Sequence, residues 1–217
     1  MDQKLLFLIN RQWTGPMLDR VMALLSSFDA WVVPMIILIG LLLWRGGFHA
    51  RAFVICAGLL VGINDGVISN SLKHLVRRPR PHQSVDAVRQ VDLAKATPRI
   101  IAVTMPLKIK LSEAASDLSS ISGRSFPSSH TVNIMTVALL ATLFFRRFGW
   151  LAFLPATGVA YSRIYTGSHW PSDVFASIFL GIGTTLLMLC GLEWLWKKYG
   201  ARFAPALHER HPSLLPS

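Results

Sequence analysis

The sequence predicts an all-α integral membrane protein, a bundle of five to six transmembrane helices. Of its 217 residues, 52% are hydrophobic, which is more than an ordinary soluble domain of this length carries. Several apolar stretches also have the length that a helix needs to cross a bilayer. Only 15% of the residues are charged, yet the formal net charge is +11. A basic excess beside long apolar runs favours membrane lipid headgroups and phosphate, and not nucleic acid, as the anionic partner.

Five apolar segments are the expected membrane helices. They lie at residues 31–45, 52–72, 131–146, 148–165 and 172–196. A helix needs about 20 residues to cross a bilayer, so the first segment is short and the last is long. Ahead of them, residues 1–30 carry apolar and polar side chains at helical spacing, which predicts an amphipathic or partly inserted segment. The transmembrane domain is therefore expected at 31–200, with a C-terminal tail at 201–217.

The long connection at residues 81–126 is expected to lie outside the cytoplasm. Short connections rich in Lys and Arg mark the cytoplasmic side, and they follow the first, third and fifth segments here. The small size and short loops are typical of a bacterial protein. We therefore expect a multi-pass protein of the bacterial inner (plasma) membrane, with the long loop facing the periplasm or cell exterior.

Three polar clusters interrupt the apolar chain, and each lies at the end of a predicted membrane helix. They are KHLVRRPRP at 73–81, FPSSH at 126–130 and SRIYTGSHWPSD at 162–173. Counting the helices span by span brings all three clusters to the same membrane surface. The clusters are therefore expected to form one site on the extracytoplasmic face.

The second cluster is expected to begin a membrane helix. Proline is favoured at the first helical position, so Pro127 should open the third helix and leave the backbone N–H groups of Ser128, Ser129 and His130 free. Free amides at the positive end of a helix dipole bind anions. Pro171 should open the fifth helix in the same way. The alternative is that each cluster is simply a stable helix start.

The third cluster pairs a histidine with a carboxylate. Asp173 follows His169 by four residues across a helix start, so the carboxylate is expected to reach the imidazole. Such a contact fixes the tautomer and leaves the other ring nitrogen as a base or nucleophile. Isolated arginines at membrane edges are mostly anchors. Several cations beside two histidines on one face favour phosphate binding instead; these cations are Lys73, Arg80 and Arg163.

Together the clusters resemble the signature of the type 2 phosphatidic acid phosphatase superfamily. The sequence carries it as Lys73…Arg80-Pro81, Pro127-Ser128-Ser129-His130 and Ser162-Arg163…His169…Asp173, in the family's order and spacing. One position departs from the pattern, because the family usually has glycine where Ser129 stands. A serine still supplies a backbone N–H, so the phosphate cradle is expected to survive with slightly less room.

The resemblance implies a role for each matching residue. His169 would attack phosphorus to give a phosphohistidine, Asp173 would orient it, and His130 would protonate the leaving oxygen and then activate water. The implied phosphate ligands are Lys73, Arg80, Ser128, Ser129 and Arg163. The family needs no metal or other cofactor, and the sequence has no carboxylate cluster of the kind that holds one.

The implied function is that of a membrane lipid phosphatase acting on a phosphate monoester or a pyrophosphate. Candidate substrates from the family are undecaprenyl pyrophosphate, phosphatidylglycerol phosphate, phosphatidic acid and lipid A phosphate. Two alternatives stay open. A lipid phosphotransferase would use the same phosphohistidine with another acceptor, and a non-enzymatic transporter would use the cations only to bind anionic lipid.

Overall fold

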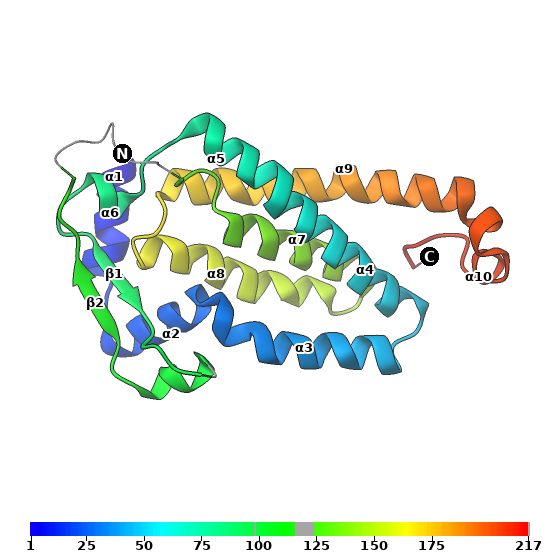
Figure 1. Cartoon of the computed structure of the whole chain (residues 1–217), viewed down its shortest axis with the longest axis horizontal. Coiled ribbons are helices and arrows are strands. Elements are labelled where there is room, and N and C mark those ends of the chain that lie inside the picture. Colours follow the sequence, from blue (N-terminus) through cyan, green and yellow to red (C-terminus); the bar gives the residue numbers. More distant parts are fainter. Residues whose placement is uncertain (98, 116–123, 217) are drawn as a thin grey trace.

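The computed structural model describes residues 1–97, 99–115 and 124–216. It is a helical bundle with a small β-hairpin at one end (Figure 1). Within the described residues, three helices are long and apolar enough to cross a membrane: Phe28–Arg45, Phe48–Ser84 and Pro171–Phe203. The prediction of a mostly helical protein is thereby confirmed, with these three helices as candidate membrane spans, and the count of five to six spans stays a prediction.

The five predicted apolar segments all form helices. The first is α3 (Phe28–Arg45), and the second is α4 (Phe48–Ile63), which continues through a π-helical stretch (Asn64–Ser69) into α5 (Asn70–Val76). The third is α7 (Ser129–Phe144), and the fourth is a 3₁₀ turn (Gly149–Ala152) followed by α8 (Phe153–Tyr165). The fifth is α9 (Pro171–Phe203), which extends beyond its predicted end and is followed by α10 (Pro205–Arg210).

Helix α7 lies at the centre of the bundle and packs against α4, α8 and α9 (Figure 1). A polar link joins three of these helices in the core. The Asn64 side-chain amide donates to Thr136 Oγ1 at 2.9 Å, and Thr185 Oγ1 donates to the same oxygen at 3.0 Å. All three side chains are completely buried. Buried polar groups of this kind need partners, so the link fixes which helix faces meet.

The N-terminal segment packs across one end of the bundle. It consists of α1 (Asp2–Phe7), a π-helical stretch (Leu8–Gln12) and α2 (Pro16–Ser26). Its buried Asp19 accepts hydrogen bonds from Arg89 at 2.8 Å and from the Tyr165 hydroxyl at 2.6 Å. The Asn10 amide donates to the Arg89 and Tyr165 carbonyls at 2.8 and 2.6 Å. These contacts tie the segment to both α8 and the hairpin.

The long connection contains β-structure, so the all-α prediction is wrong there. After α6 (Pro81–Ser84), β1 (Arg89–Asp92) pairs antiparallel with β2 (Lys108–Leu111), and a 3₁₀ helix (Arg99–Thr104) lies between them. Polar and apolar residues alternate in the KIKL of β2, which is the strand pattern that could have predicted it. The part of the predicted loop at 116–123 lies outside the described residues.

Candidate active site

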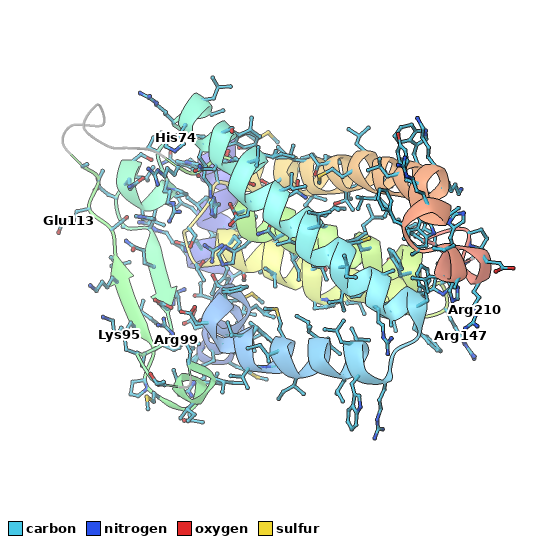
Figure 2. The ribbon with its side chains drawn as sticks, turned by 45° about the vertical axis from the view of Figure 1, so that its right-hand side comes forward. His74, Lys95, Arg99, Glu113, Arg147 and Arg210 are labelled. Carbon is cyan, nitrogen blue, oxygen red and sulfur yellow. The ribbon has the colours of Figure 1, made fainter. Side chains whose placement is uncertain are left out.

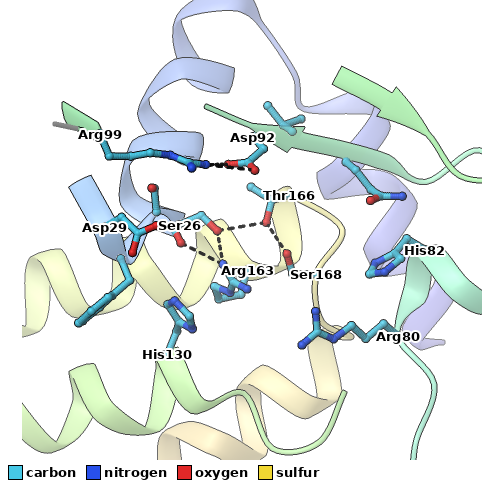
Figure 3. Close-up of a pocket in the computed structure, with 14 residues that line it drawn as sticks. Ser26, Asp29, Arg80, His82, Asp92, Arg99, His130, Arg163, Thr166 and Ser168 are labelled. Carbon is cyan, nitrogen blue, oxygen red and sulfur yellow. Dashed lines mark hydrogen bonds and ion pairs between the residues drawn. The ribbon is translucent and has the colours of Figure 1, made fainter. Parts of the chain in front are cut away.

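The three polar clusters meet at the hairpin end of the bundle. Lys73 lies in α5, Arg163 in the last turn of α8, and His169 in the turn before α9. Lys73 Nζ donates to Ser129 Oγ at 2.5 Å, which joins the first cluster to the second. Figure 3 shows Arg80, His130 and Arg163 pointing toward a common cavity from three different elements. Residues that are far apart in the sequence therefore share one site.

His169 is almost completely buried, with 3% of its surface exposed. Its Nδ1 lies 2.6 Å from the backbone carbonyl oxygen of Ser125. A carbonyl only accepts hydrogen bonds, so Nδ1 carries the proton and Nε2 keeps a free lone pair. Burial lowers the pKa of His169 well below its ordinary value, and the charges of Arg163 and Arg80 lower it further. The ring is therefore neutral and has one nucleophilic nitrogen at neutral pH.

The expected contact between Asp173 and the His169 ring is replaced by another. The Asp173 carboxylate accepts hydrogen bonds from Ser125 Oγ at 2.6 Å and from Arg78 Nη1 at 2.5 Å. The four-residue spacing carries no information about Ser125, which binds both residues and lies between them in space. Asp173 thus acts on the imidazole indirectly, because it holds the residue whose carbonyl binds the ring.

The start of α7 differs from the predicted one. The helix begins at Ser129 with Ser128 as its N-cap, so Pro127 lies before the helix and does not open it. The Ser128 N–H is not free, because it donates to Ser177 Oγ of α9 at 2.9 Å. Ser128 is fully buried, and its hydroxyl oxygen accepts a bond from Thr131. The prediction for Pro171 is confirmed, since it is the first residue of α9.

The substituted position in the second motif has its own contact. Ser129 Oγ accepts the hydrogen bond from Lys73 Nζ, which a glycine could not do. Sequence reasoning expected this serine to supply only a backbone N–H. The side chain additionally fixes the ammonium group of Lys73 next to the start of α7.

Arg163 is 8% exposed and is only partly satisfied by protein groups. Its Nη1 donates to the Ser26 carbonyl at 3.1 Å and contacts the Ser26 hydroxyl as well. Its Nε is buried and has no partner among the described residues. A buried guanidinium N–H without an acceptor carries a large desolvation cost, which an anionic ligand would offset.

The cavity has a volume of about 510 Å³ and contains more than the three motifs. Arg80, His130 and Arg163 lie on one side of it, and Asp29, Asp92 and Arg99 lie on the other (Figure 3). The remaining lining residues are Ser26, Ser27, Phe28, His82, Gln90, Val91, Thr166 and Ser168. Thr166 and Ser168 lie in the third cluster, and His82 follows the first. The other five lie at the junction of α2 and α3 and in β1, where no motif marks them.

Comparisons with known proteins cover different parts of the chain. A PAP2 superfamily model matches residues 51–197. A bacitracin transport permease protein, BcrC of Bacillus licheniformis, is 41% identical over 64 residues, which are 30% of this chain and 32% of that protein. The chain thus spans about a third of that relative's length.

Two longer similarities reach across most of the chain. The lipid A 4'-phosphatase of Porphyromonas gingivalis is 27% identical over 180 residues, which cover 82% of this chain and 67% of that protein. The crystal structure of Aquifex aeolicus LpxE has the same fold, with a TM-score of 0.56 and 23% identity over 86% of this chain and 93% of that one. Since the family model covers well over half of the sequence and includes all three motifs, the chain belongs to the PAP2 superfamily.

Proposed function

We propose that the protein is an integral membrane lipid phosphatase that works without a metal. One observation carries the proposal: the neutral, buried imidazole of His169 has a free Nε2 in a site that also holds Arg80, Arg163 and His130. Phosphoryl transfer depends mainly on positioning and on stabilising negative charge, and these side chains are suited to both.

The reaction would proceed in two steps through a phosphohistidine. His169 Nε2 attacks phosphorus, the P–O bond to the lipid breaks, and His130 gives its proton to the leaving oxygen. A water molecule then attacks the phosphohistidine and passes a proton to His130, the P–N bond breaks, and phosphate leaves. The dianionic phosphate favours the protonated form of a histidine beside it, which prepares His130 for the first step. Lys73, Arg80, Ser128, Ser129 and Arg163 are the proposed phosphate ligands.

The lipid headgroup would occupy the polar cavity, and its tail would lie along α3. An apolar groove of about 470 Å³ runs along this helix, lined by Val33, Pro34, Ile37, Leu38, Leu41 and Ile100. Asp29 of the polar cavity and Val33 and Ile37 of the groove follow one another at four-residue intervals, so they share one face of α3. Substrates with this shape include undecaprenyl pyrophosphate, phosphatidylglycerol phosphate, phosphatidic acid and lipid A phosphate.

We also propose a membrane topology. The chain crosses a bacterial inner membrane five times, and the site faces the periplasm or the cell exterior. The domain at 31–200 would form the spans, the segment at 1–30 would lie at the membrane surface, and 201–217 would form a tail. An odd number of crossings between α1 and α10 is supported by their positions at opposite ends of the bundle (Figure 1). The clusters of basic residues in the short connections support the orientation.

The test is phosphate release from a panel of purified lipid phosphates in detergent. His169→Ala should lower the rate about 1,000-fold or more, because removal of a nucleophile abolishes the covalent route. His49→Ala is the matched control, since His49 lies at the start of α4, far from the cavity, and its rate should stay at the wild-type level. If His169→Ala released phosphate at the wild-type rate, the proposed mechanism would be wrong.

The same assay separates the two alternatives. A phosphotransferase would give a phosphorylated acceptor lipid without a matching amount of free phosphate. A transporter is suggested by the name of the relative from Bacillus licheniformis. A transporter would move anionic lipid across the bilayer of reconstituted vesicles at nearly the same rate in the wild type and in His169→Ala. The wild-type transporter would release no phosphate.

A further inference from the structure

Beside the proposed active site lies an arginine of the first cluster that is not among the signature residues. Arg78 stands two residues before Arg80, yet it does not line the cavity. Its Nη1 donates to Asp173 at 2.5 Å and to Ser172 Oγ at 2.8 Å, and its Nη2 donates to Asp2 at 2.7 Å. Both terminal nitrogens of the guanidinium therefore bind carboxylates, and Arg80, not Arg78, is the proposed phosphate ligand.

Arg78 also holds Ser125 through its backbone. The Ser125 N–H donates to the Arg78 carbonyl at 2.9 Å, and Ser125 Oγ donates to Asp173 at 2.6 Å. The Ser125 carbonyl then binds His169 Nδ1 at 2.6 Å. Every hydrogen-bonding group of Ser125 thus has a partner. The Arg78 carbonyl binds the Ser125 N–H directly, and the Arg78 guanidinium holds the carboxylate of Asp173 that binds Ser125 Oγ.

Asp2 completes the arrangement from the first helix. One oxygen accepts from the Ser172 N–H at 2.9 Å, and the other accepts from Ser172 Oγ at 2.6 Å and from Arg78. Burial alone would raise the pKa of Asp2, but the bonds from Ser172 and Arg78 outweigh it and lower the pKa. Asp2 is therefore ionised at neutral pH, and it ties α1 to both Arg78 and the first turn of α9.

We propose that Arg78, held by Asp2, is a positioning residue that fixes the His169 ring, with Nδ1 on the Ser125 carbonyl, beside the residues that line the cavity. The proposal rests on the proposed function, since it assigns the support of that nucleophile. The chain of contacts runs Asp2–Arg78–Asp173–Ser125–His169, and it fixes both the tautomer and the plane of the ring. The planar guanidinium spans two carboxylates at once, which the single ammonium of a lysine cannot do. Trp170 restrains it further, with the Arg78 guanidinium carbon 5.2 Å from the ring centre.

The experiment compares Arg78→Ala with Arg77→Ala. Arg77 is the adjacent arginine and is exposed to solvent. Its side chain is hydrogen-bonded only to the carbonyl of His74 among the described residues, so it is the matched control. Arg78→Ala should lower kcat about 10- to 100-fold, with KM and the inhibition constant of inorganic phosphate changed less than about threefold. Arg77→Ala should leave all three at wild-type values. An unchanged phosphate inhibition constant also shows that the variant site is folded.

Two further variants trace the contact chain. Arg78→Lys should recover only part of the lost kcat, because one carboxylate stays unpaired. Asp2→Asn should lower kcat less than Arg78→Ala does. Because Asp2 acts through Arg78, the double variant should have nearly the same kcat as Arg78→Ala alone. If Arg78→Ala instead raised KM and the phosphate inhibition constant about tenfold at constant kcat, Arg78 would be a phosphate ligand and the proposal would be overturned.

A measurement without turnover keeps this proposal separate from the proposed function. The His169 Nδ1–H proton, bonded to a carbonyl, should give a downfield NMR signal that is lost in His169→Ala. That signal should broaden or disappear in Arg78→Ala and persist in Arg77→Ala. A wild-type signal in Arg78→Ala would overturn the positioning role, whether or not the protein hydrolyses lipid phosphates. An active His169→Ala protein would instead overturn only the proposed function.

Discussion

The imidazole of His169 is held by a backbone group, and this decides its chemistry. A carboxylate partner would share the proton and favour the charged ring, whereas the Ser125 carbonyl only accepts the Nδ1–H. The ring also has little contact with solvent and lies near two arginines. Burial and the arginines favour the neutral form, which is the form that can attack phosphorus, and they outweigh the bond to the Ser125 carbonyl, which by itself would raise the pKa.

The buried environment of His169 determines how its ring should respond to pH. Because burial and the nearby arginines lower its pKa below the ordinary value of 6.5, His169 should stay neutral as the pH falls through that value. The unfolded chain takes up this proton first, so the histidine's contribution to stability should be lost as the pH falls below 6.5. The ring carbon-bound proton of His169, followed by NMR without ligand, should hold its shift from pH 8 to about 6. A midpoint at or above the value of free histidine would contradict the burial argument.

The motifs named Arg80, His130 and Arg163, which line the cavity, because each motif lies at a helix end. Most of the other lining residues and the contacts of Asp173 could not be predicted from the sequence. The partners of Asp173 depend on tertiary structure: Ser125 is 48 residues away from it and Arg78 is 95. The four-residue spacing suggested His169 as the partner of Asp173. Only the packing of the three chain segments shows that Ser125 lies between Asp173 and His169.

At the scale of elements, helices α7 and α9 approach closely at a glycine. A Cβ atom added to Gly181 would lie 2.7 Å from the Val132 carbonyl oxygen and 3.2 Å from Met135 Cβ. The first of these neighbours is helix backbone and cannot move aside. Close approach of backbones at small residues is a common way of packing membrane helices. Gly181 therefore sets the distance between the two helices that carry His130 and Asp173.

Gly181→Ala should accordingly destabilise the protein, whereas Gly183→Ala should not. Overpacking of this kind costs about 1–3 kcal/mol. Gly183 lies in the same helix, and a Cβ there would have no atom within 4 Å, so its replacement should be neutral or slightly stabilising. Thermal unfolding of both variants in one detergent measures the difference. Equal melting temperatures would show that the α7–α9 contact tolerates a methyl group.

The elements themselves were predictable wherever an apolar run was long. All five predicted segments are helices, because hydrophobic length is a strong signal in membrane proteins. The failures were local. Pro127 lies before α7 because Ser128 serves as the N-cap and bonds to α9, a contact that no local pattern reveals. The hairpin was missed because four-residue strands give only a weak alternation.

The whole molecule has polar ends and an apolar middle. Figure 2 shows Lys95, Arg99 and Glu113 at the hairpin end, and Arg147 and Arg210 at the opposite end. The hairpin is fixed to the bundle, because Arg89 pairs with Asp19 at 2.8 Å and Asp19 binds Tyr165. Burial alone would lower the pKa of Arg89, but Asp19 outweighs it and raises the pKa. The hairpin therefore forms a wall of the site, with Gln90, Val91 and Asp92 of β1 lining the cavity.

This polarity leads to a prediction about membrane orientation. Lys110 lies in β2 at the site end, and Arg147 lies in a short connection at the other end; both are exposed. With Cys56 and Cys190 replaced by serine, a single cysteine is introduced by Lys110→Cys or Arg147→Cys. In intact spheroplasts, a membrane-impermeant maleimide should label the Lys110→Cys protein at once and the Arg147→Cys protein only after permeabilisation. Each variant thus serves as the control for the other. The reverse pattern would put the site in the cytoplasm, and the substrate would then have to be sought among lipids of the inner leaflet.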